Sequence, residues 1–542
     1  MSDFSKRRKK LAQIDFSNSL TLKELAPFSK TNLASIFETF SKRAPIQCFH
    51  VDLAFAKAID EREDVQTFLA LLMAQSRAGH LCITVEKDRI LPDCPEEILE
   101  KALSGAKQFI PKPNGPIVQE NNHYYLSRNY YFEKSMEKTL LALLSRPCTP
   151  IEPQELSSQL TEEQREAVTK ALKNSFLLLT GGPGRGKTFT AAHILNHFKG
   201  RVLITAPTGK ATAKLAEGMT QYQVTSGTLH QLLKIRGPKD FYQTPPRLDA
   251  DLIIVDEASM IDARLFSTFL QAVPPNARLI IMGDGDQLPP VEAGDLFTQI
   301  CQHIKQKFPK NYCELTRCLR SDRKELLDLA DHVRHGETQA IEMANLQPLP
   351  ADLKEPILHH FPKPTKERPD PKQLLENLQK FRILTPLREG RYGVSGIGDQ
   401  ALAHLTENCK LPYFFAYPIL ITKNSYEHEL YNGEAGIVIR EIKEKNGTLQ
   451  PEDRAYFPGG KEMAALLLPP HEISYALSIH KSQGSEFDEL LLLLPPGSER
   501  FSREILYTGI TRARKSLTIC GDKEMFISLL VKSGKRTSNI LK

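Results

Sequence analysis

One glycine-rich segment, residues 175–190 with the sequence SFLLLTGGPGRGKTFT, limits the folds that the chain can adopt. Its apolar start is typical of a buried strand, and the stretch TAAHILNHF that continues it is typical of a helix. Between them the spacing Gly181-x-x-x-x-Gly186-Lys187-Thr188 is that of a P-loop, in the strand–loop–helix context that such a loop needs. Inward-turned backbone N–H groups and the helix N-terminus favour phosphate there. The segment therefore predicts an α/β domain that binds a nucleoside triphosphate.

The residues of this loop have separate expected roles. Lys187 is expected to reach the β- and γ-phosphates, and the Thr188 hydroxyl is expected to hold Mg²⁺. The residues expected to surround the phosphates are Gly181, Gly182, Pro183, Gly184, Arg185 and Gly186. A nucleotide and Mg²⁺ are thus the predicted cofactors.

Further apolar stretches extend the α/β pattern, at residues 201–206, 251–256 and 277–282. Ligands bind at the carboxyl ends of parallel strands in such sheets. Asp256 ends the second of these stretches and is expected to hold Mg²⁺, while Glu257 is expected to orient or deprotonate the attacking water. Gln287 follows the last stretch in the loop GDGDQLPP. That loop is either a sensor of the γ-phosphate or a tight surface loop.

The residues alone leave two interpretations of Gln164 open. Thr161, followed three residues later by Gln164, fits a capping box at a helix N-terminus. A glutamine shortly before a P-loop strand can also read the edge of adenine with its amide. The first interpretation is structural, and the second makes Gln164 part of the nucleotide site.

At 542 residues the chain has room for three or four domains. Its composition, 41% hydrophobic and 25% charged residues, is that of a globular protein. The net charge of +6 is compatible with a polyanionic partner without requiring one. The basic run at residues 6–10 is most simply a solvated tail, with a nucleic-acid contact as the alternative. We expect a cytoplasmic protein without membrane association, because the N-terminus has no signal-peptide pattern and the apolar runs are too short to span a bilayer.

Changes along the chain in the pattern of apolar, polar and turn-forming residues predict three domains. Residues 1–150 show helical patterns without evident chemistry and are expected to form a helical adaptor. Residues 151–300 contain the P-loop and form the first α/β domain, with a polar, proline-containing excursion at 237–247. Residues 301–542 contain a second α/β unit, interrupted at 413–470 by short strands and glycine turns typical of a small β-barrel.

The order of these motifs resembles that of the superfamily 1 helicases, and within them the RecD group. Over about two-thirds of the chain the matching segments are LTEEQREAV, GGPGRGKT, APTGKA, TLHQLL, LIIVDEASMID, GDGDQLPP, LTRCLR, ALSIHKSQGSEF and LYTGITRAR. The strings LREGRYGVSG and NGEAG favour the RecD group over other members. Arg185 departs from the family pattern, which commonly has a small residue there. Since that position contributes backbone more than side chain, we expect function to survive with altered nucleotide affinity.

The resemblance implies two RecA-like domains with ATP and Mg²⁺ in the cleft between them. In that arrangement Gln164 reads adenine, Gln287 senses the γ-phosphate, and Glu486 contacts the ribose. Arg320 and Arg512 of the second domain are the implied arginine fingers, which stabilise transition-state charge. The residues implied to face single-stranded DNA are Pro207, Thr208, Lys210, His230, His480 and Lys481.

The resemblance also implies a function, that of an ATP-dependent 5′→3′ DNA translocase and helicase. Such a chain is the motor subunit of a RecBCD-type helicase-nuclease in double-strand break repair and recombination, with RecB-like and RecC-like partners and DNA ends as substrate. Residues 1–150 then form a docking surface, 237–247 a strand-separating pin and 413–470 an SH3-like insert. The alternatives are a stand-alone superfamily 1 DNA or RNA helicase and a nucleotide-bound structural subunit of a repair complex.

Overall fold

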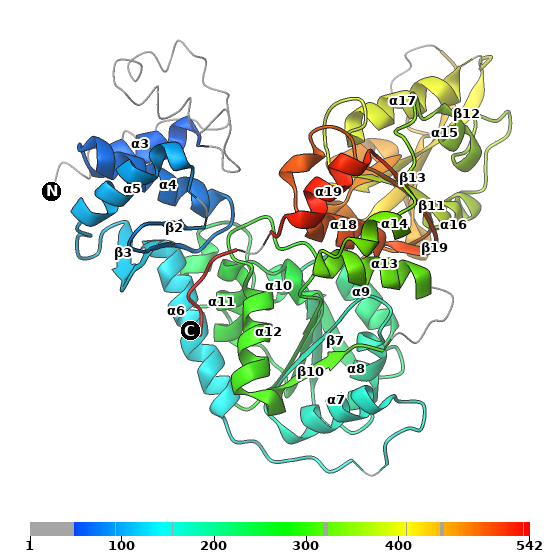
Figure 1. The fold of residues 1–542 in the computed structure, drawn as a ribbon. Coiled ribbons are helices and arrows are strands. Elements are labelled where there is room, and N and C mark those ends of the chain that lie inside the picture. The colour runs from blue at the N-terminus through cyan, green and yellow to red at the C-terminus, as the bar shows by residue number, and fades with distance from the viewer. Residues whose placement is uncertain are drawn as a thin grey trace.

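In the computed structural model two units, one N-terminal and one C-terminal, flank a central α/β domain (Figure 1). The N-terminal unit is drawn in blue, the first α/β domain in cyan to green, and the second α/β domain in yellow to red. The residues that the structure describes are 48–92, 94–153, 155–317, 324–407, 409–425, 427–444, 449–534 and 536–541. The basic run at residues 6–10 and the candidate arginine finger Arg320 lie outside them.

The N-terminal unit is a mixed α/β structure and not the helical domain that we predicted. Its helices are α3 (His50–Ile59), α4 (Glu63–Arg77) and α5 (Glu96–Gln108). They share one apolar core with a four-stranded antiparallel sheet in the order β2-β1-β4-β3. The strands are β1 (Cys82–Val85), β2 (Ile90–Leu91), β3 (Ile117–Glu120) and β4 (His123–Leu126). Strands of two to four residues are too short to produce a recognisable alternation of apolar and polar residues.

Helix α6 (Ser127–Ser145) connects this unit to the first α/β domain. It runs along that domain in Figure 1, and Met136, Leu140 and Leu143 belong to the domain's core. The boundary that we predicted at residue 150 therefore follows a helix that both units share.

The first α/β domain is built on a six-stranded parallel sheet in the order β10-β5-β9-β8-β6-β7. Its strands are β5 (Phe176–Gly181), β6 (Val202–Ala206), β7 (Val224–Thr228), β8 (Leu252–Val255), β9 (Arg278–Gly283) and β10 (Tyr312–Leu315). Alternate strand residues face two separate cores, because neighbouring side chains of a strand point to opposite faces. One face is covered by α6, α10 (Leu229–Leu232), α11 (Ala263–Ala272) and α12 (Leu296–Lys307). The other is covered by α7 (Glu162–Lys173), α8 (Lys187–Leu195) and α9 (Gly209–Glu217).

The predicted boundary at residue 300 is wrong. It falls inside α12, and the edge strand β10 lies beyond it, paired with β5 through Tyr312 and Leu178. The first domain therefore continues to about residue 315. A four-residue strand with a polar residue in it gives too weak a pattern to be recognised from the sequence.

The second α/β domain has a four-stranded parallel sheet in the order β17-β11-β18-β19. Its strands are β11 (Phe381–Thr385), β17 (Ala476–Ser478), β18 (Phe487–Leu493) and β19 (Ala513–Cys520). One face packs against α13 (Lys324–His335), α14 (Gln339–Met343), α18 (Arg503–Ile510) and α19 (Lys523–Val531). The other packs against α15 (Lys354–His360), α16 (Pro371–Lys380) and α17 (Val394–Thr406). The predicted second α/β unit is confirmed in these layers.

The predicted insert is an antiparallel five-stranded sheet in the order β15-β14-β13-β12-β16. Its strands are β12 (Tyr413–Ile421), β13 (Ala435–Ile442), β14 (Arg454–Phe457), β15 (Lys461–Ala464) and β16 (His471–Ile473). The strands are hydrogen-bonded to their neighbours in this order, with β15 and β16 at the two edges. Phe415 of β12 and Ile437 of β13 are buried in the core of the second domain.

The excursion at residues 237–247 does not form a hairpin. Its only regular element is a single 3₁₀ turn, Asp240–Tyr242, within a segment that the structure describes throughout. Phe241 of this turn is buried in the core of the first domain, and the Arg264 guanidinium lies 4.1 Å from the centre of its ring. The segment is thus anchored to the domain through Phe241, and its role as a strand-separating pin stays a prediction.

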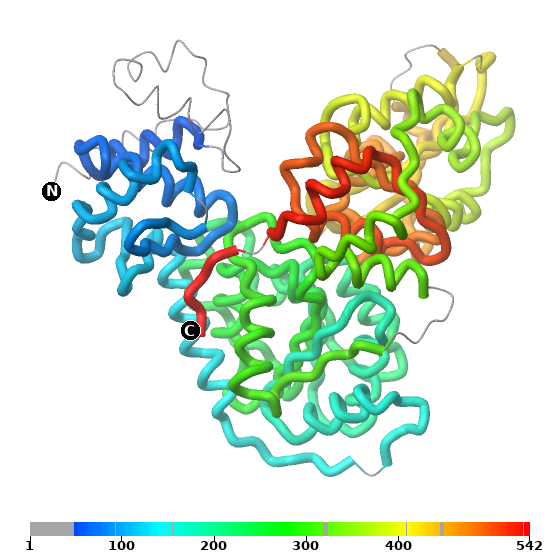
Figure 2. The backbone as a smooth tube through the Cα atoms, viewed as in Figure 1, coloured from blue at the N-terminus to red at the C-terminus, as the bar shows by residue number. Residues whose placement is uncertain are grey.

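The C-terminal tail returns from the second domain to the other two units, and its end lies beside α6 in Figure 2. The Thr537 N–H donates to His80 Nδ1 (2.9 Å), and the Thr537 carbonyl accepts from the Leu81 N–H (3.0 Å). Ile540 and Leu541 are buried in the core of the first domain. The tail therefore joins all three units in one segment. None of the described helices is both long enough and apolar enough to cross a bilayer.

The tail also creates a titratable buried group. Glu133 of α6 is completely buried, and its carboxylate accepts from the Tyr125 hydroxyl (3.0 Å) and the Asn539 N–H (3.2 Å). Burial raises the pKa of this carboxyl to about 7. Because the folded chain then binds the proton more tightly than the unfolded chain, the stability contributed by Glu133 is complete below about pH 4.5 and is lost as pH rises to about 7.

We predict that Glu133→Gln removes this dependence, because glutamine is neutral at every pH. Relative to the variant, the wild type should lose on the order of 3 kcal/mol of unfolding free energy between pH 4.5 and 8. Urea unfolding across that pH range measures the difference. The exposed Glu100→Gln serves as the control. Equal pH slopes for the wild type and Glu133→Gln would contradict the assignment.

Candidate nucleotide-binding site between the two α/β domains

The P-loop connects β5 to α8 through a tight turn that depends on its glycines. Gly181, Gly184 and Gly186 have φ values of +154°, +74° and +85°, which L side chains rarely adopt. A Cβ at Gly181 would lie 2.8 Å from the Leu315 carbonyl oxygen. The Lys187 ammonium donates to the carbonyl oxygens of Gly181 (2.5 Å) and Gly182 (3.2 Å), so it lies within the loop that it is expected to serve.

The acidic pair lies at the carboxyl end of β8. The Asp256 carboxylate accepts from the Glu257 N–H (2.8 Å), and Glu257 has a φ of +52°. That conformation is rare for a residue other than glycine and commonly marks a functional site. Burial raises the pKa of both carboxyls, and the charge of Asp256 raises that of Glu257 further. The positive charges of Arg512 and Lys187 oppose the rise at Glu257, so both cations lie within electrostatic range of this carboxyl.

The structure confirms one of the two interpretations of Gln164, the capping box, while the contact with adenine stays a prediction. Its Oε1 accepts from the Thr161 N–H (3.1 Å), and the Thr161 hydroxyl accepts from the Gln164 N–H (3.3 Å), which confirms the capping box. Its Nε2 is buried without a partner among the described residues. The amide group therefore still has donors for a ligand such as adenine.

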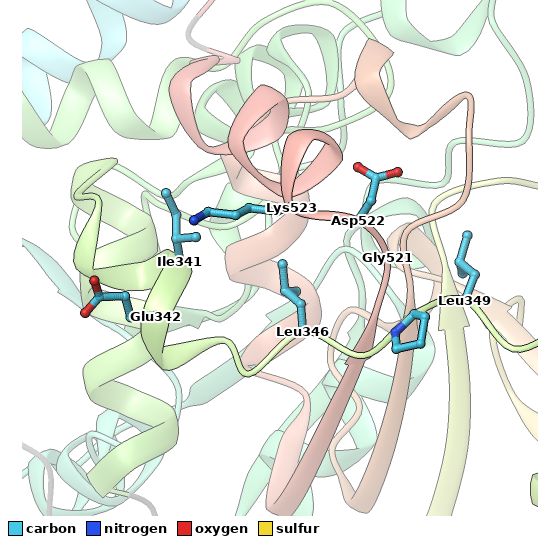
Figure 3. A pocket seen from close by; sticks show the side chains of 8 residues that line it. Ile341, Glu342, Leu346, Leu349, Gly521, Asp522 and Lys523 are labelled. Atoms are coloured by element: carbon cyan, nitrogen blue, oxygen red, sulfur yellow. The ribbon is translucent and has the colours of Figure 1, made fainter.

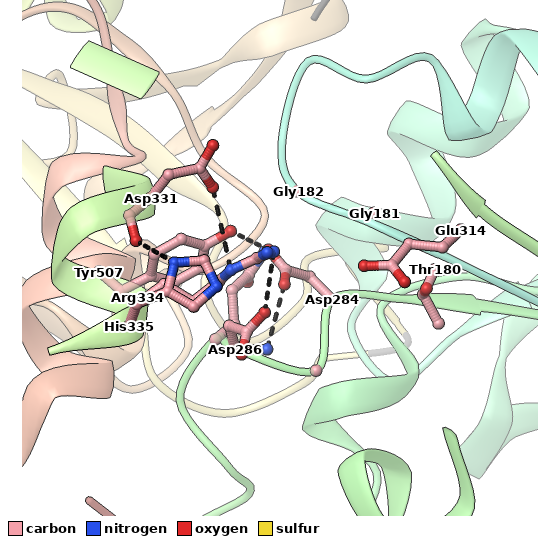
Figure 4. Close-up of polar contacts among 12 residues, drawn as sticks. Thr180, Gly181, Gly182, Asp284, Asp286, Glu314, Asp331, Arg334, His335 and Tyr507 are labelled. Carbon is pink, nitrogen blue, oxygen red and sulfur yellow. Dashed lines mark hydrogen bonds and ion pairs between the residues drawn. The ribbon is translucent and has the colours of Figure 1, made fainter. Parts of the chain in front are cut away.

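The loop at residues 283–290, hereafter the sensor loop, lies between the two domains. Gln287 Nε2 and the Tyr507 hydroxyl both donate to Asp284 Oδ2, at 3.1 and 2.9 Å. The Leu288 N–H donates to the Thr508 hydroxyl (2.9 Å), again from the first domain to α18. Figure 4 shows Asp284 and Tyr507 side by side near Gly182. Because Asp284, Gln287 and Leu288 are buried, the alternative of a tight surface loop is wrong.

Arg512 is held from the second domain. Its guanidinium is buried and donates to the carbonyl oxygens of Thr508 and Ser485 and to the Thr511 hydroxyl, each at 3.1 Å. These bonds fix the guanidinium near Glu257. The other predicted arginine finger, Arg320, cannot be placed, because residues 318–323 lie outside the described chain.

The side chain of Arg185 is bonded to the second domain, although we expected this position to contribute backbone more than side chain. Its guanidinium is 7% exposed and donates to both carboxylate oxygens of Asp331 on α13, at 3.0 and 3.1 Å. A large side chain at this loop position therefore reaches the second domain, which the usual small residue cannot do.

Glu486 and Lys210 line one cavity of about 480 Å³, although the resemblance implies different ligands for them. The Glu486 carboxylate accepts from Arg514 Nε (3.2 Å), and the Lys210 ammonium donates to the Ser485 hydroxyl (2.7 Å). The cavity is bordered by α9, the second domain and the insert, whose Lys461 reaches it.

The other residues implied to face DNA are spread over both domains. The Thr208 hydroxyl caps α9, after the half-buried Pro207. His230 lies against Phe241, with ring centres 6.3 Å apart, and His480 lies against Phe501 at 6.2 Å. The Lys481 ammonium is paired with Glu472 (2.6 Å). A further cavity, of about 560 Å³ between α14 and α19, contains none of the predicted site residues (Figure 3).

The residues present fit ATP and Mg²⁺. The glycine loop offers a phosphate cradle, Thr188 lies in the first turn of α8, and Asp256 supplies the hard oxygen ligand that Mg²⁺ prefers. The unpartnered Gln164 Nε2 supplies a donor suited to a base edge.

Three residues of the interface escaped the sequence analysis. Tyr507 lies within LYTGITRAR, so the motif itself was a usable signal. Asp331 and Arg334 of α13 lie outside every motif, and only the fold brings them to the P-loop and the sensor loop.

The fold and site define a P-loop nucleotide-binding protein with two α/β domains. In agreement with this, residues 159–347 match the family described as AAA domain, and residues 474–520 match the UvrD-like helicase C-terminal domain.

Individual similar proteins indicate a narrower group than these two domain families do. The RecBCD enzyme subunit RecD of Mycolicibacterium smegmatis is 29% identical over 94% of this chain and 99% of its own. The RecD subunit of Haemophilus influenzae is 28% identical over 70% of this chain and 72% of its own. The ATP-dependent RecD2 DNA helicase of Deinococcus radiodurans is 30% identical over 82% of this chain and 63% of its own. The resemblance to the RecD group of superfamily 1 helicases is confirmed.

Proposed function

We propose that this chain is an ATP-dependent DNA helicase, the 5′→3′ motor subunit of a RecBCD-type helicase-nuclease in double-strand break repair and recombination. One observation carries the proposal: the P-loop, the Asp256–Glu257 pair and the sensor loop of one domain meet Arg512 and Tyr507 of the other. Similarity to RecD subunits over most of the chain supports the choice of complex.

In the proposed mechanism the first domain holds ATP and the second responds to it. Gln164 Nε2 reads adenine, and Lys187 binds the phosphates. Thr188 and Asp256 hold Mg²⁺, which neutralises phosphate charge when bound. Glu257 is the general base, and its raised pKa strengthens it as a proton acceptor. Arg512 stabilises the charge that develops on the phosphates.

The sensor loop provides the connection to movement. Gln287 and Tyr507 share Asp284, so a change at the γ-phosphate that moves Gln287 is transmitted to α18. Repeated closing and opening of the two domains would then move the chain along one DNA strand. Contacts to phosphates and sugars position a strand without reading its sequence, so binding should be sequence-tolerant and salt-sensitive.

The remaining assignments are also proposals. Residues 413–470 form an SH3-like insert, and the N-terminal unit docks onto a RecC-like partner. A RecB-like partner supplies the nuclease and a second motor. The chain acts in the cytoplasm. A stand-alone helicase is the second candidate, favoured by the similarity to the RecD2 helicase.

We predict that Lys187→Ala lowers ATP turnover by at least 100-fold, because the ammonium that binds the transferred phosphate is lost. Steady-state phosphate release measures the rate, and circular dichroism checks the fold. Lys199→Ala, on the exposed turn after α8, is the matched control and should retain the wild-type rate. Unchanged turnover in a folded Lys187→Ala chain would contradict the site.

We predict that duplexes with a 5′ single-stranded tail are unwound faster than those with a 3′ tail. Strand separation is measured for the chain alone and for the complex with its RecB-like subunit inactivated in its own P-loop. Faster unwinding of the 3′-tailed duplex would overturn the proposed polarity.

A further inference from the structure

The P-loop carries a cation that the proposed catalytic scheme does not use. The Arg185 guanidinium is 7% exposed, and its Nη2 donates to both oxygens of Asp331, which is 41% exposed. Hydrogen bonds between two ionised groups are shorter and stronger than those between neutral groups. The pair therefore joins the loop that surrounds the phosphates to α13 of the second domain.

The same helix makes a second contact one turn later. Arg334 pairs with Asp286 of the sensor loop (3.3 Å) and approaches Asp331 (3.9 Å). Figure 4 shows Asp331, Arg334 and Asp286 grouped together, with the segment of Gly181 and Gly182 across from them. Helix α13 thus contacts both loops of the first domain that are expected to surround the terminal phosphate.

The guanidinium retains an unused donor toward the P-loop. Arg185 Nε is buried without a partner among the described residues. It lies 3.2 Å from the position that a Cβ on Gly182 would occupy. A buried cation with an unsatisfied N–H is costly, and phosphate oxygens are strong acceptors for a guanidinium.

We propose that Arg185 is a positioning residue that couples nucleotide binding to the second domain, because a shift of its side chain toward the nucleotide phosphates would pull Nη2 away from Asp331. The proposal rests on the proposed function, because it assumes a nucleotide in the P-loop. Phosphate binding draws Arg185 from Asp331 and frees α13, and engagement of Asp331 weakens nucleotide binding. Such coupling is reciprocal, so either site reports the other.

This coupling predicts opposite effects for the two partners. Asp331→Asn should tighten nucleotide binding at least threefold, because it releases the guanidinium and removes a negative charge. Arg185→Thr should weaken binding, because the phosphates lose a guanidinium donor. In the Arg185→Thr background, Asp331→Asn should have less than a twofold effect. Arg185→Lys, which keeps the charge but loses the planar guanidinium and its additional N–H donors, should give an intermediate response.

The test is a double-mutant cycle in the full chain. Fluorescence titration with N-methylanthraniloyl derivatives of ADP and ATPγS gives the dissociation constants. Asp328→Asn is the matched control, because Asp328 is an exposed carboxylate one turn before Asp331 on the same helix. Hydrogen exchange in α13 is measured with and without saturating ADP, and a purely structural ion pair would not make that exchange nucleotide-dependent.

The expected result is a nucleotide-dependent exchange rate in α13 of the wild type that Arg185→Thr abolishes, together with the non-additive cycle. If Arg185→Thr does not fold, the cycle with Arg185→Lys decides in its place. Equal effects of Asp331→Asn and Asp328→Asn, or an additive cycle, would overturn the coupling and leave the proposed function intact. A wild-type chain that binds neither nucleotide would overturn both.

Discussion

The buried carboxylate of Asp284 is the interaction on which the arrangement of the two α/β domains depends. It accepts from Gln287 within the sensor loop and from Tyr507 on α18, so one oxygen is shared between the domains. A buried carboxylate needs such donors, because its charge is costly to remove from water. The resulting bond also places the Tyr507 hydroxyl 3.0 Å from the position of a Cβ on Gly182, a tight contact that glycine avoids. The P-loop, the sensor loop and α18 are therefore fitted to one another.

Much of the fold and site could be predicted, because the determining patterns are local. The strands β5, β6, β8 and β9 are apolar runs that end in, or are directly followed by, glycine, proline or an acidic residue. The loops after them contain residues that we predicted to bind the nucleotide, Mg²⁺ or DNA. The capping box at Thr161 and Gln164 is likewise a short-range signal that the structure confirms. Their order along the chain was enough to identify the helicase family.

What the sequence could not reveal depends on contacts between distant residues. The pairing of β10 with β5, the ion pair of Arg185 with Asp331 and the return of the tail to α6 each join residues more than a hundred positions apart. No local pattern encodes such pairs. In the sequence, Asp331 cannot be distinguished from any other acidic residue on the surface of a helix. The short strands of the N-terminal unit could not be predicted for a different reason, since two to four residues are too few to show an alternation of apolar and polar side chains.

The central claim is that the site between the domains converts ATP hydrolysis into movement on DNA. The most direct test is the ATP turnover of the purified full chain with and without single-stranded DNA of mixed sequence, in low salt. The account predicts at least a tenfold stimulation, because a DNA strand bound across both domains, as proposed, would favour the closed site. Hydrolysis at the same rate with and without DNA, in a chain that binds the DNA, would contradict it.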